Sequence, residues 1–175
     1  ELYLNLMTNS FTWNPADFFT LYGKNPIPEG KKSIISVSQF TPKMDQHKNL
    51  DSIRKISKKI MSGEKAEFIV FPELSITGHI KPEKRAETIN ASNINCFIEI
   101  AMELRVYLIA GFAEQEGQKL FNTAIIAGPE GLIGTYRKTH LSNADEKWAS
   151  KYPMVIKSWQ SNWEHLSHYF QNLSS

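Results

Sequence analysis

Residues 68–79 read FIVFPELSITGH, and the first six letters carry a clear structural signal. Four apolar residues, Phe68 to Phe71, run directly into Pro72 and a single carboxylate, Glu73. A short apolar run that ends at a proline is typical of a buried strand. In open α/β sheets, reactive groups gather beyond the carboxyl ends of the strands. The stretch therefore predicts a buried strand that presents Glu73 at its end.

The chain around this strand alternates between strand-like and helix-like segments. Apolar, β-branched runs predict strands, and apolar residues repeating every three or four positions predict helices. We expect strands at 33–40, 66–74 and 106–115, helices at 49–63 and 81–105, and a hairpin at 119–141 that turns at GPEG. Continuously apolar strands between helices indicate α/β layers in which the strands are covered on both faces and are parallel at least in the first half of the chain.

Composition excludes several classes of protein. The 175 residues are 41% hydrophobic, which suits one globular domain with a real core. A net charge of +2 gives no argument for a nucleic-acid or membrane partner. No apolar run is long enough for a transmembrane helix, and the first residues make a poor signal peptide. The single cysteine, Cys96, allows no intrachain disulfide, so we expect a cytoplasmic location.

A second charged group accompanies Glu73 in the predicted sheet. Lys138 closes the last predicted strand, so the two side chains are candidates to face each other at strand ends. A Glu shielded from water acts as a general base. A neighbouring Lys keeps that acid ionised and stabilises an oxyanion as charge develops. The alternative is a simple ion pair between loops, and spacing alone does not separate the two.

Three motifs carry a family resemblance: FPELSITG at 71–78, LFNTAIIAGPEGLIG at 120–134 and YRKTHL at 136–141. In order and separation they resemble the nitrilase, or carbon–nitrogen hydrolase, superfamily across residues 33–141. That resemblance implies a four-layer α-β-β-α sandwich, usually assembled as dimers or larger oligomers. It also implies hydrolysis of amides, nitriles or carbamyl compounds by a Glu-Lys-Cys triad, with no metal and no organic cofactor.

The resemblance assigns roles to individual residues. Glu73 takes the place of the general base and Lys138 that of the oxyanion-stabilising lysine. Members often carry a second Glu eight residues after the Lys, which helps to position substrate, and Glu146 stands at that spacing. Asn122 and Thr123 match the family's NTA strand, where we expect structural roles.

The third member of the triad has no counterpart at its expected place. The family's nucleophilic cysteine follows the Lys, and no cysteine follows Lys138. Cys96 lies upstream, at a helical position among apolar neighbours, where a lone cysteine behaves as a small hydrophobe. No adjacent base or positive charge is available to activate it. We therefore expect a truncated, inactive half of the sandwich, whose uncovered sheet face exposes apolar surface and favours association or aggregation.

The two ends of the chain differ from the middle. Residues 1–32 are rich in aromatic side chains without a clean period, and they are interpreted as an N-terminal arm or an upstream remnant. The hydrolase-like portion is placed at 33–145. Residues 146–175 form a tail in which Ile156, Trp159 and Trp163 recur at helical spacing, so an amphipathic helix is expected after Pro153.

Part of the tail has its own resemblance. KYPMVIKSWQSNWEHLSHYF, at 151–170, is similar to a segment of the mutator-type insertion-sequence transposases. None of that family's metal-binding acids can be placed here. The resemblance implies a junction between Ser142 and Lys151, which leaves open whether Glu146 belongs to the hydrolase or to the tail.

Three hypotheses follow for function. The first is a truncated amidase- or nitrilase-type hydrolase whose ancestor used a small amide, nitrile or carbamyl substrate. The second is a non-catalytic assembly protein that pairs with itself or with another chain, which in one variant supplies the missing cysteine. The third is a transposase-derived DNA-processing remnant, which the tail disfavours because it carries no strong basic stripe.

Overall fold

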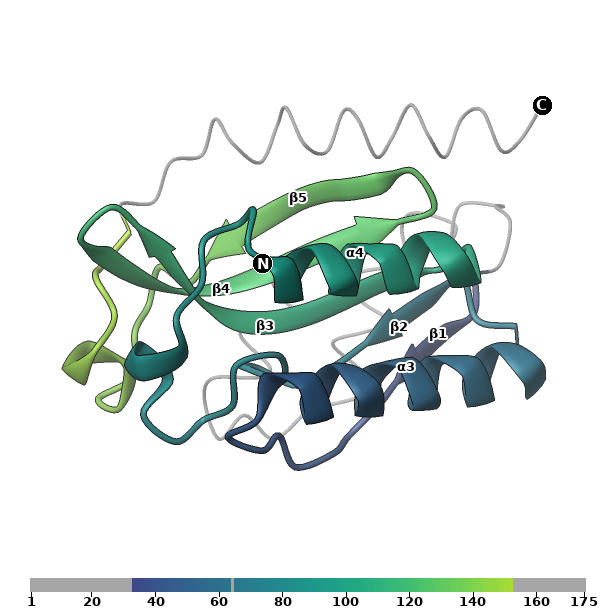
Figure 1. Cartoon of the computed structure of the whole chain (residues 1–175), viewed down its shortest axis with the longest axis horizontal. Helices are drawn as coiled ribbons and strands as arrows, with labels where there is room; N and C mark the ends of the chain where they lie inside the picture. Colours follow the sequence, from purple (N-terminus) through teal and green to yellow (C-terminus); the bar gives the residue numbers. More distant parts are fainter. Residues whose placement is uncertain (1–32, 64, 153–175) are drawn as a thin grey trace, which may run out of the picture. The chain divides into compact units, whose positions relative to one another are not determined.

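A computed structural model describes residues 33–63 and 65–152 (Figure 1). They form a five-stranded sheet in the order β1-β2-β3-β4-β5. The strands are β1 Ile35–Val37, β2 Phe68–Val70, β3 Tyr107–Glu116, β4 Lys119–Gly128 and β5 Gly131–Arg137. The first three strands pair in parallel, whereas β3, β4 and β5 pair in antiparallel fashion. The predicted α/β fold, with a parallel first half and a terminal hairpin, is confirmed.

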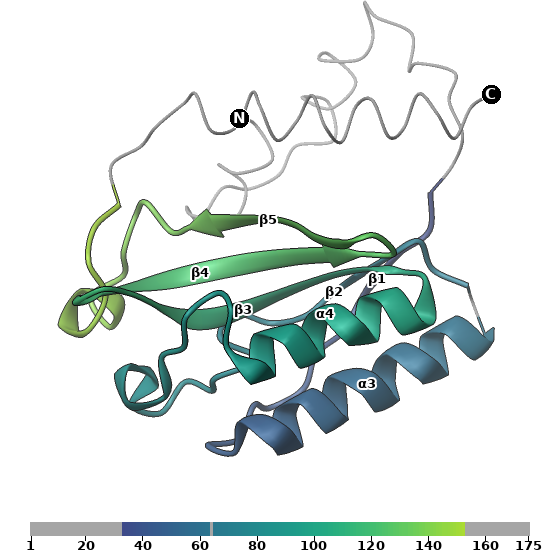
Figure 2. The same ribbon diagram turned by 45° about the horizontal axis from the view of Figure 1, so that its top comes forward.

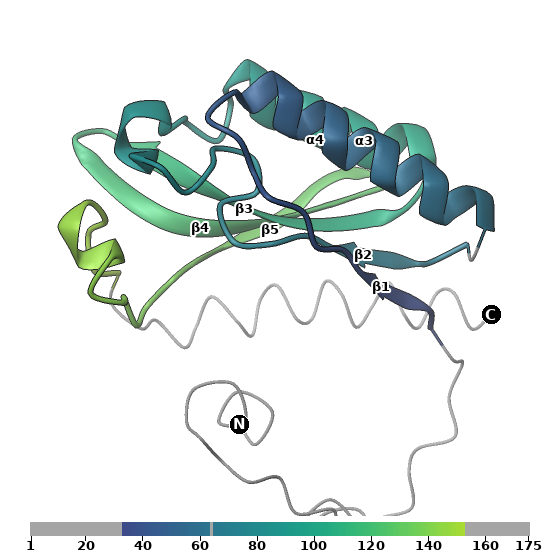
Figure 3. The same cartoon turned by 90° about the horizontal axis from the view of Figure 1, so that it is seen from below.

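The two α-helices of the described residues lie on the same face of the sheet (Figures 2 and 3). They are α3 Gln46–Gly63, which connects β1 to β2, and α4 Ser92–Leu104, which connects β2 to β3. Because β1, β2 and β3 follow one another in a single direction, two connections of the same hand place their helices on one side. In the part of the chain that the structure describes, the helices cover one face of the sheet, so the expected cover on both faces is seen on one face alone.

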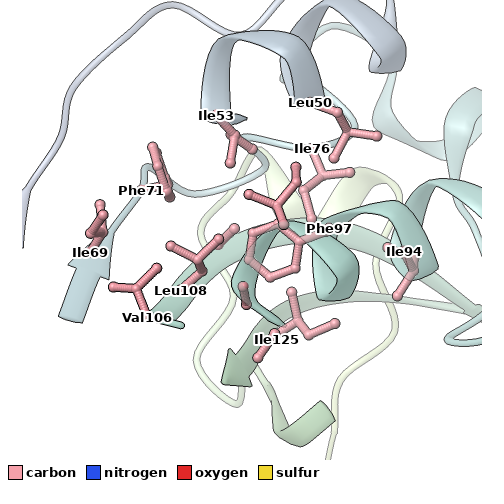
Figure 4. Packing of buried hydrophobic residues seen from close by; sticks show 14 of the residues in the cluster. Leu50, Ile53, Ile69, Phe71, Ile76, Ile94, Phe97, Val106, Leu108 and Ile125 are labelled. Atoms are coloured by element: carbon pink, nitrogen blue, oxygen red, sulfur yellow. The ribbon is translucent and has the colours of Figure 1, made fainter. Parts of the chain in front are cut away.

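The core lies between the two helices and the sheet. Its fully buried members include Ile53 of α3, Phe97 of α4, Leu108 of β3 and Ile125 of β4. In Figure 4 the ring of Phe97 lies in the middle of this group, with Leu108 and Ile125 around it. Alternate residues of β3 and β4 face the helices, as the period of two in a strand requires.

The opposite face of the sheet exposes apolar side chains. Ile35 and Val37 of β1 are 60% and 81% exposed. The parallel register aligns them with Phe68 and Val70 of β2, which are half-buried, while Ile69 between these two is fully buried against the helices. The predicted exposure of apolar surface on one sheet face is thus present in the described residues.

The predicted helix at 81–105 is wrong in its first half. Pro82–Arg85 form the short 3₁₀ helix η1, and α4 begins only at Ser92. Between them Glu87 pairs with β3: its N–H donates to the carbonyl of Ala113 at 2.9 Å, and its carbonyl accepts from the N–H of Gln115 at 2.9 Å. β2 ends at Val70, so the last part of β3 has a free edge that this segment fills. A tertiary pairing therefore overrides the local preference for helix.

The first two strands are shorter than predicted, with three residues each. Within residues 33–63 and 65–152, neither helix is both long and apolar enough to cross a membrane. The predicted N-terminal arm and the predicted helix of the tail lie outside the described residues.

Candidate functional site

Glu73 lies in a tight turn directly after β2. The turn is closed by the N–H of Ser75, which donates to the carbonyl of Pro72 at 3.2 Å. Leu74 has a φ of 50°, in the left-handed region that a side chain with a Cβ rarely adopts. Such strain persists only where the surroundings hold it, and it is concentrated at functional sites.

The surroundings of this turn are β3 and two buried hydroxyl groups. The N–H of Ile76 donates to the carbonyl of Gly111 at 3.0 Å. The hydroxyls of Ser75 and Thr77, both fully buried, accept from the N–H groups of Gly111 and Ala113 at 3.4 and 3.0 Å. The hydrogen bonds of Ser75, Ile76 and Thr77 therefore hold the turn against β3, with the side chain of Glu73 directed away from the core.

Lys138 follows the last residue of β5 and reaches Glu73. Its Nζ donates to Oε1 of Glu73 at 2.8 Å and to Oδ2 of Asp145 at 2.7 Å. Its backbone N–H donates to the carbonyl of Asn122 on β4 at 2.8 Å. The structure thus brings together two residues that lie 65 positions apart, as the sequence predicted.

Asp145 is a member of this site that sequence reasoning missed. It is only 5% exposed, in the short 3₁₀ helix η2 Asp145–Lys147. Its Oδ2 accepts from Lys138, from the hydroxyl of Ser142 at 2.7 Å and from the N–H of Ser142 at 3.1 Å. The spacing rule selected the adjacent residue, Glu146, which instead forms an ion pair with Lys151 at 3.1 Å. The substrate-positioning role of Glu146 stays a prediction.

Asn122 links the two carboxylates. Its Nδ2 donates to Oε1 of Glu73 at 2.8 Å and to Oδ1 of Asp145 at 2.9 Å. Asn122 thus touches the candidate base directly, and its expected structural role stays a prediction. Thr123 lies on the other face of the strand, where its hydroxyl donates to Glu114 at 2.8 Å.

The electrostatics of the site favour the charged forms of Lys138 and Asp145. Burial alone would lower the pKa of Lys138, but hydrogen bonds to Asp145 and Glu73 outweigh it and raise that pKa above its ordinary value. Burial would raise the pKa of Asp145, yet the hydrogen bonds from Lys138, Ser142 and Asn122 lower it to about 2. Lys138 and Asp145 are consequently both ionised at neutral pH.

We expect Asp145 to make the fold sensitive to acid. Its pKa in the folded chain, about 2, lies below its ordinary value of 3.8. The carboxylate therefore stabilises the fold fully above about pH 4, and this contribution disappears as the pH falls toward 2. Thermal melts of the wild type and of Asp145→Asn between pH 2 and 5 measure it. The difference in melting temperature between the two proteins should shrink as the pH falls. A difference that stays constant would contradict the lowered pKa of Asp145.

The charged side chains of the site are partly open to solvent. The Glu73 side chain is 49% exposed and that of Lys138 is 32% exposed, so the candidate base is only partly shielded from water. The uncovered sheet face leaves this end of the sheet open to solvent.

Cys96 is half-buried on α4 and packs against the core cluster, as predicted. The described residues hold no group of three or more His, Cys, Asp and Glu that could bind a metal ion.

Comparison with known proteins identifies the family. The family model described as carbon-nitrogen hydrolase matches residues 34–169. The chain belongs to the carbon–nitrogen hydrolase family. The match also covers residues 146–169, most of the segment that the sequence places in the tail.

Two curated relatives illustrate the breadth of this family. A nitrilase of Pyrococcus abyssi is 33% identical over 114 residues, which are 61% of this chain and 43% of that protein. The omega-amidase NIT2 of Danio rerio is 36% identical over 93 residues, which are 50% of this chain and 33% of that protein. The chain therefore spans less than half the length of these curated relatives.

Solved structures agree with the fold. An N-terminal amidase matches with a TM-score of 0.60 and 26% identity, covering 68% of this chain and 31% of that chain. A carbon–nitrogen hydrolase superfamily protein of Xanthomonas campestris matches with a TM-score of 0.62 and 18% identity, over 71% of this chain and 49% of that chain. The α/β arrangement of the described residues is thus one portion of the carbon–nitrogen hydrolase fold.

Proposed function

We propose that residues 33–152 form the Glu–Lys portion of an amide-hydrolysing site, and that the 175-residue chain does not turn over amides by itself. The observation that carries this is the contact of 2.8 Å between Lys138 Nζ and Glu73 Oε1 at the carboxyl ends of the strands. No cysteine follows Lys138 to serve as the nucleophile. The family's Glu-Lys-Cys chemistry would therefore be incomplete in this chain.

The contacts assign a task to each group. Oε1 of Glu73 accepts from Lys138 and Asn122, while Oε2 accepts no hydrogen bond from the described residues. Oε2 is therefore available to take a proton from a nucleophile. An ammonium has three N–H donors, and Lys138 uses two of them on Glu73 and Asp145. The third can stabilise the oxyanion that forms when a carbonyl carbon is attacked.

The class of substrate follows from the family and its named members. The relatives include a nitrilase, an omega-amidase and an (R)-stereoselective amidase, so the ancestral substrate is proposed to be a small molecule with an amide or nitrile group. The proposed chemistry uses only protein side chains.

Ammonia release is the test of this proposal. The purified chain is incubated with a panel of primary amides and nitriles, and ammonia is measured beside the variant Glu73→Gln. We expect no release above that of Glu73→Gln, because a general base and an oxyanion donor without a nucleophile form no acyl-enzyme. Release by the wild type that Glu73→Gln abolishes would contradict the proposed inactivity while supporting the role of Glu73.

A second candidate function is assembly with another copy or another chain. The observation that favours it is the apolar sheet face with Ile35 and Val37 largely exposed. Contiguous exposed apolar surface marks interaction sites. Size-exclusion chromatography and a thermal melt of the same preparation separate the outcomes: a defined oligomer with a cooperative melt supports assembly, and a polydisperse aggregate opposes it. The transposase-derived origin of residues 146–175 stays a prediction.

A further inference from the structure

Arg137 and Lys138 are neighbours in sequence but lie on opposite faces of the sheet. Arg137 pairs in register with Thr123 of β4, whose side chain is on the face that carries the helices. Lys138 is next to Asn122, whose side chain is on the face that carries Glu73. The two cations at the end of β5 therefore point in opposite directions, as the period of two in a strand requires.

Arg137 spans the hairpin and contacts β3. Its Nε and Nη2 donate to the two carboxylate oxygens of Glu114 at 2.8 and 2.6 Å, in a bidentate pair. Nη1 and Nη2 also donate to Glu116 at 3.0 and 2.8 Å. Since β3 and β5 are separated by β4, this side chain ties three adjacent strands together at one end of the sheet.

Further side chains pack around the pair of Arg137 and Glu114. Glu114 is 5% exposed, and its Oε2 accepts a further hydrogen bond from Thr123. The guanidinium carbon of Arg137 lies 4.1 Å from the ring centroid of Phe121 and 5.1 Å from that of Tyr152. A bidentate pair packed against two aromatic rings is rigid, and its guanidinium stays charged.

Rigidity matters at this position because β5 is an edge strand of the sheet that the described residues form. Its register shifts between Ile126 and Ala127 of β4, and its last pair in register is Thr123 with Arg137. One residue later, Lys138 must hold its Nζ within 3 Å of two carboxylates. The ends of edge strands fray readily when few contacts hold them. The contacts of Arg137 with Glu114 and Glu116 hold the strand at the residue immediately before Lys138, whose position the site requires.

We propose that Arg137 is a positioning residue for Lys138, which fixes the end of β5 through Glu114 and Glu116 so that Lys138 reaches Glu73 and Asp145. The significance of this role for catalysis rests on the proposed function of Lys138. The geometric claim itself does not, and its test below uses no substrate.

Competitive acetylation of lysines with acetic anhydride, followed by mass spectrometry, tests the proposal on the full chain. The rate and its pH dependence are measured for Lys138 and, as internal references, for the exposed Lys48 and Lys55. Only a deprotonated amine reacts, so Lys138 between Glu73 and Asp145 should react more slowly than the references. In Arg137→Met we expect Lys138 to react severalfold faster at neutral pH than in the wild type, because its Nζ loses the hydrogen bonds to Glu73 and Asp145 that favour the protonated form.

Two further variants make the outcome decisive. Arg54→Met removes an arginine of α3 that is paired with Glu103 on the helical surface, and it should leave Lys138 unchanged. Arg137→Lys keeps the charge but loses the bidentate fork, so it should give a smaller acceleration. If Lys138 of folded Arg137→Met is acetylated at the same rate as in the wild type, the proposal is overturned. If Arg137→Met fails to melt cooperatively, Arg137→Lys decides: faster labelling supports the role and unchanged labelling rejects it.

The result is distinguishable from that of the proposed function. Amide turnover abolished by Glu73→Gln would contradict inactivity and leave the acetylation result untouched. Unchanged acetylation in the Arg137 variants would remove the positioning role and leave the Glu–Lys assignment standing.

Discussion

Replacing Gly111 with alanine is expected to separate Glu73 from Lys138 and to destabilise the fold. A Cβ atom at this position of β3 would lie 2.3 Å from the backbone nitrogen of Leu74 and 2.9 Å from the Cα of Glu73. Both neighbours are main-chain atoms in a turn that is held by hydrogen bonds, so neither can rotate away. We expect a loss of roughly 1–3 kcal/mol in the free energy of unfolding, as for other overpacked sites.

The readout for Gly111→Ala combines a thermal melt with cross-linking. A carbodiimide joins a carboxylate to an amine only where the two are in contact, so the yield of the Glu73–Lys138 link reports their proximity. Gly63→Ala is the matched control, because nothing lies within 4 Å of its added Cβ. If Gly111→Ala melts at the wild-type temperature and forms the Glu73–Lys138 link in undiminished yield, the expected clash between the added Cβ and the turn is contradicted.

The second large effect is expected from Phe97→Ala. Phe97 is fully buried in α4 between the helical layer and the sheet (Figure 4). Removal of a buried aromatic ring typically lowers the free energy of unfolding by about 3–5 kcal/mol, through lost transfer energy and the cavity that remains. Because domains are stable by only about 5–15 kcal/mol, this change removes a large share.

Met102→Ala on the same helix is the control for Phe97→Ala, since Met102 is 46% exposed. It should change the melting temperature little. Urea unfolding followed by circular dichroism gives both values. Equal, small effects of the two substitutions would contradict the position of the core between α4 and the sheet.

The sequence predicted the elements that local pattern controls. The continuous apolar run before Pro72 correctly indicated a strand, of which Ile69 alone is fully buried, and the GPEG turn correctly indicated the hairpin of β4 and β5. The helix at 81–105 failed because Glu87 pairs with the free edge of β3, an interaction whose partners are distant in sequence. Local periodicity carries no information about which strand edge remains open.

The site was predictable only in part for the same reason. Glu73 and Lys138 could be found because each ends a strand, and parallel strands end at one edge of a sheet. Asp145 lies in a loop, and nothing in its spacing distinguishes it from Glu146. Only the serine three residues before it hinted at a local turn, because Ser142 and Asp145 hydrogen-bond each other. Asn122 required the register of β4, which the hairpin pattern alone does not give.

A zero-length cross-link in the wild-type chain tests the central claim most directly. That claim is that Glu73 and Lys138, 65 residues apart, form one site. After treatment with a carbodiimide, digestion and mass spectrometry should show an amide bond between Glu73 and Lys138 that is absent from Glu73→Gln. Lys138 that is joined only to other carboxylates, or that remains free, would contradict the site.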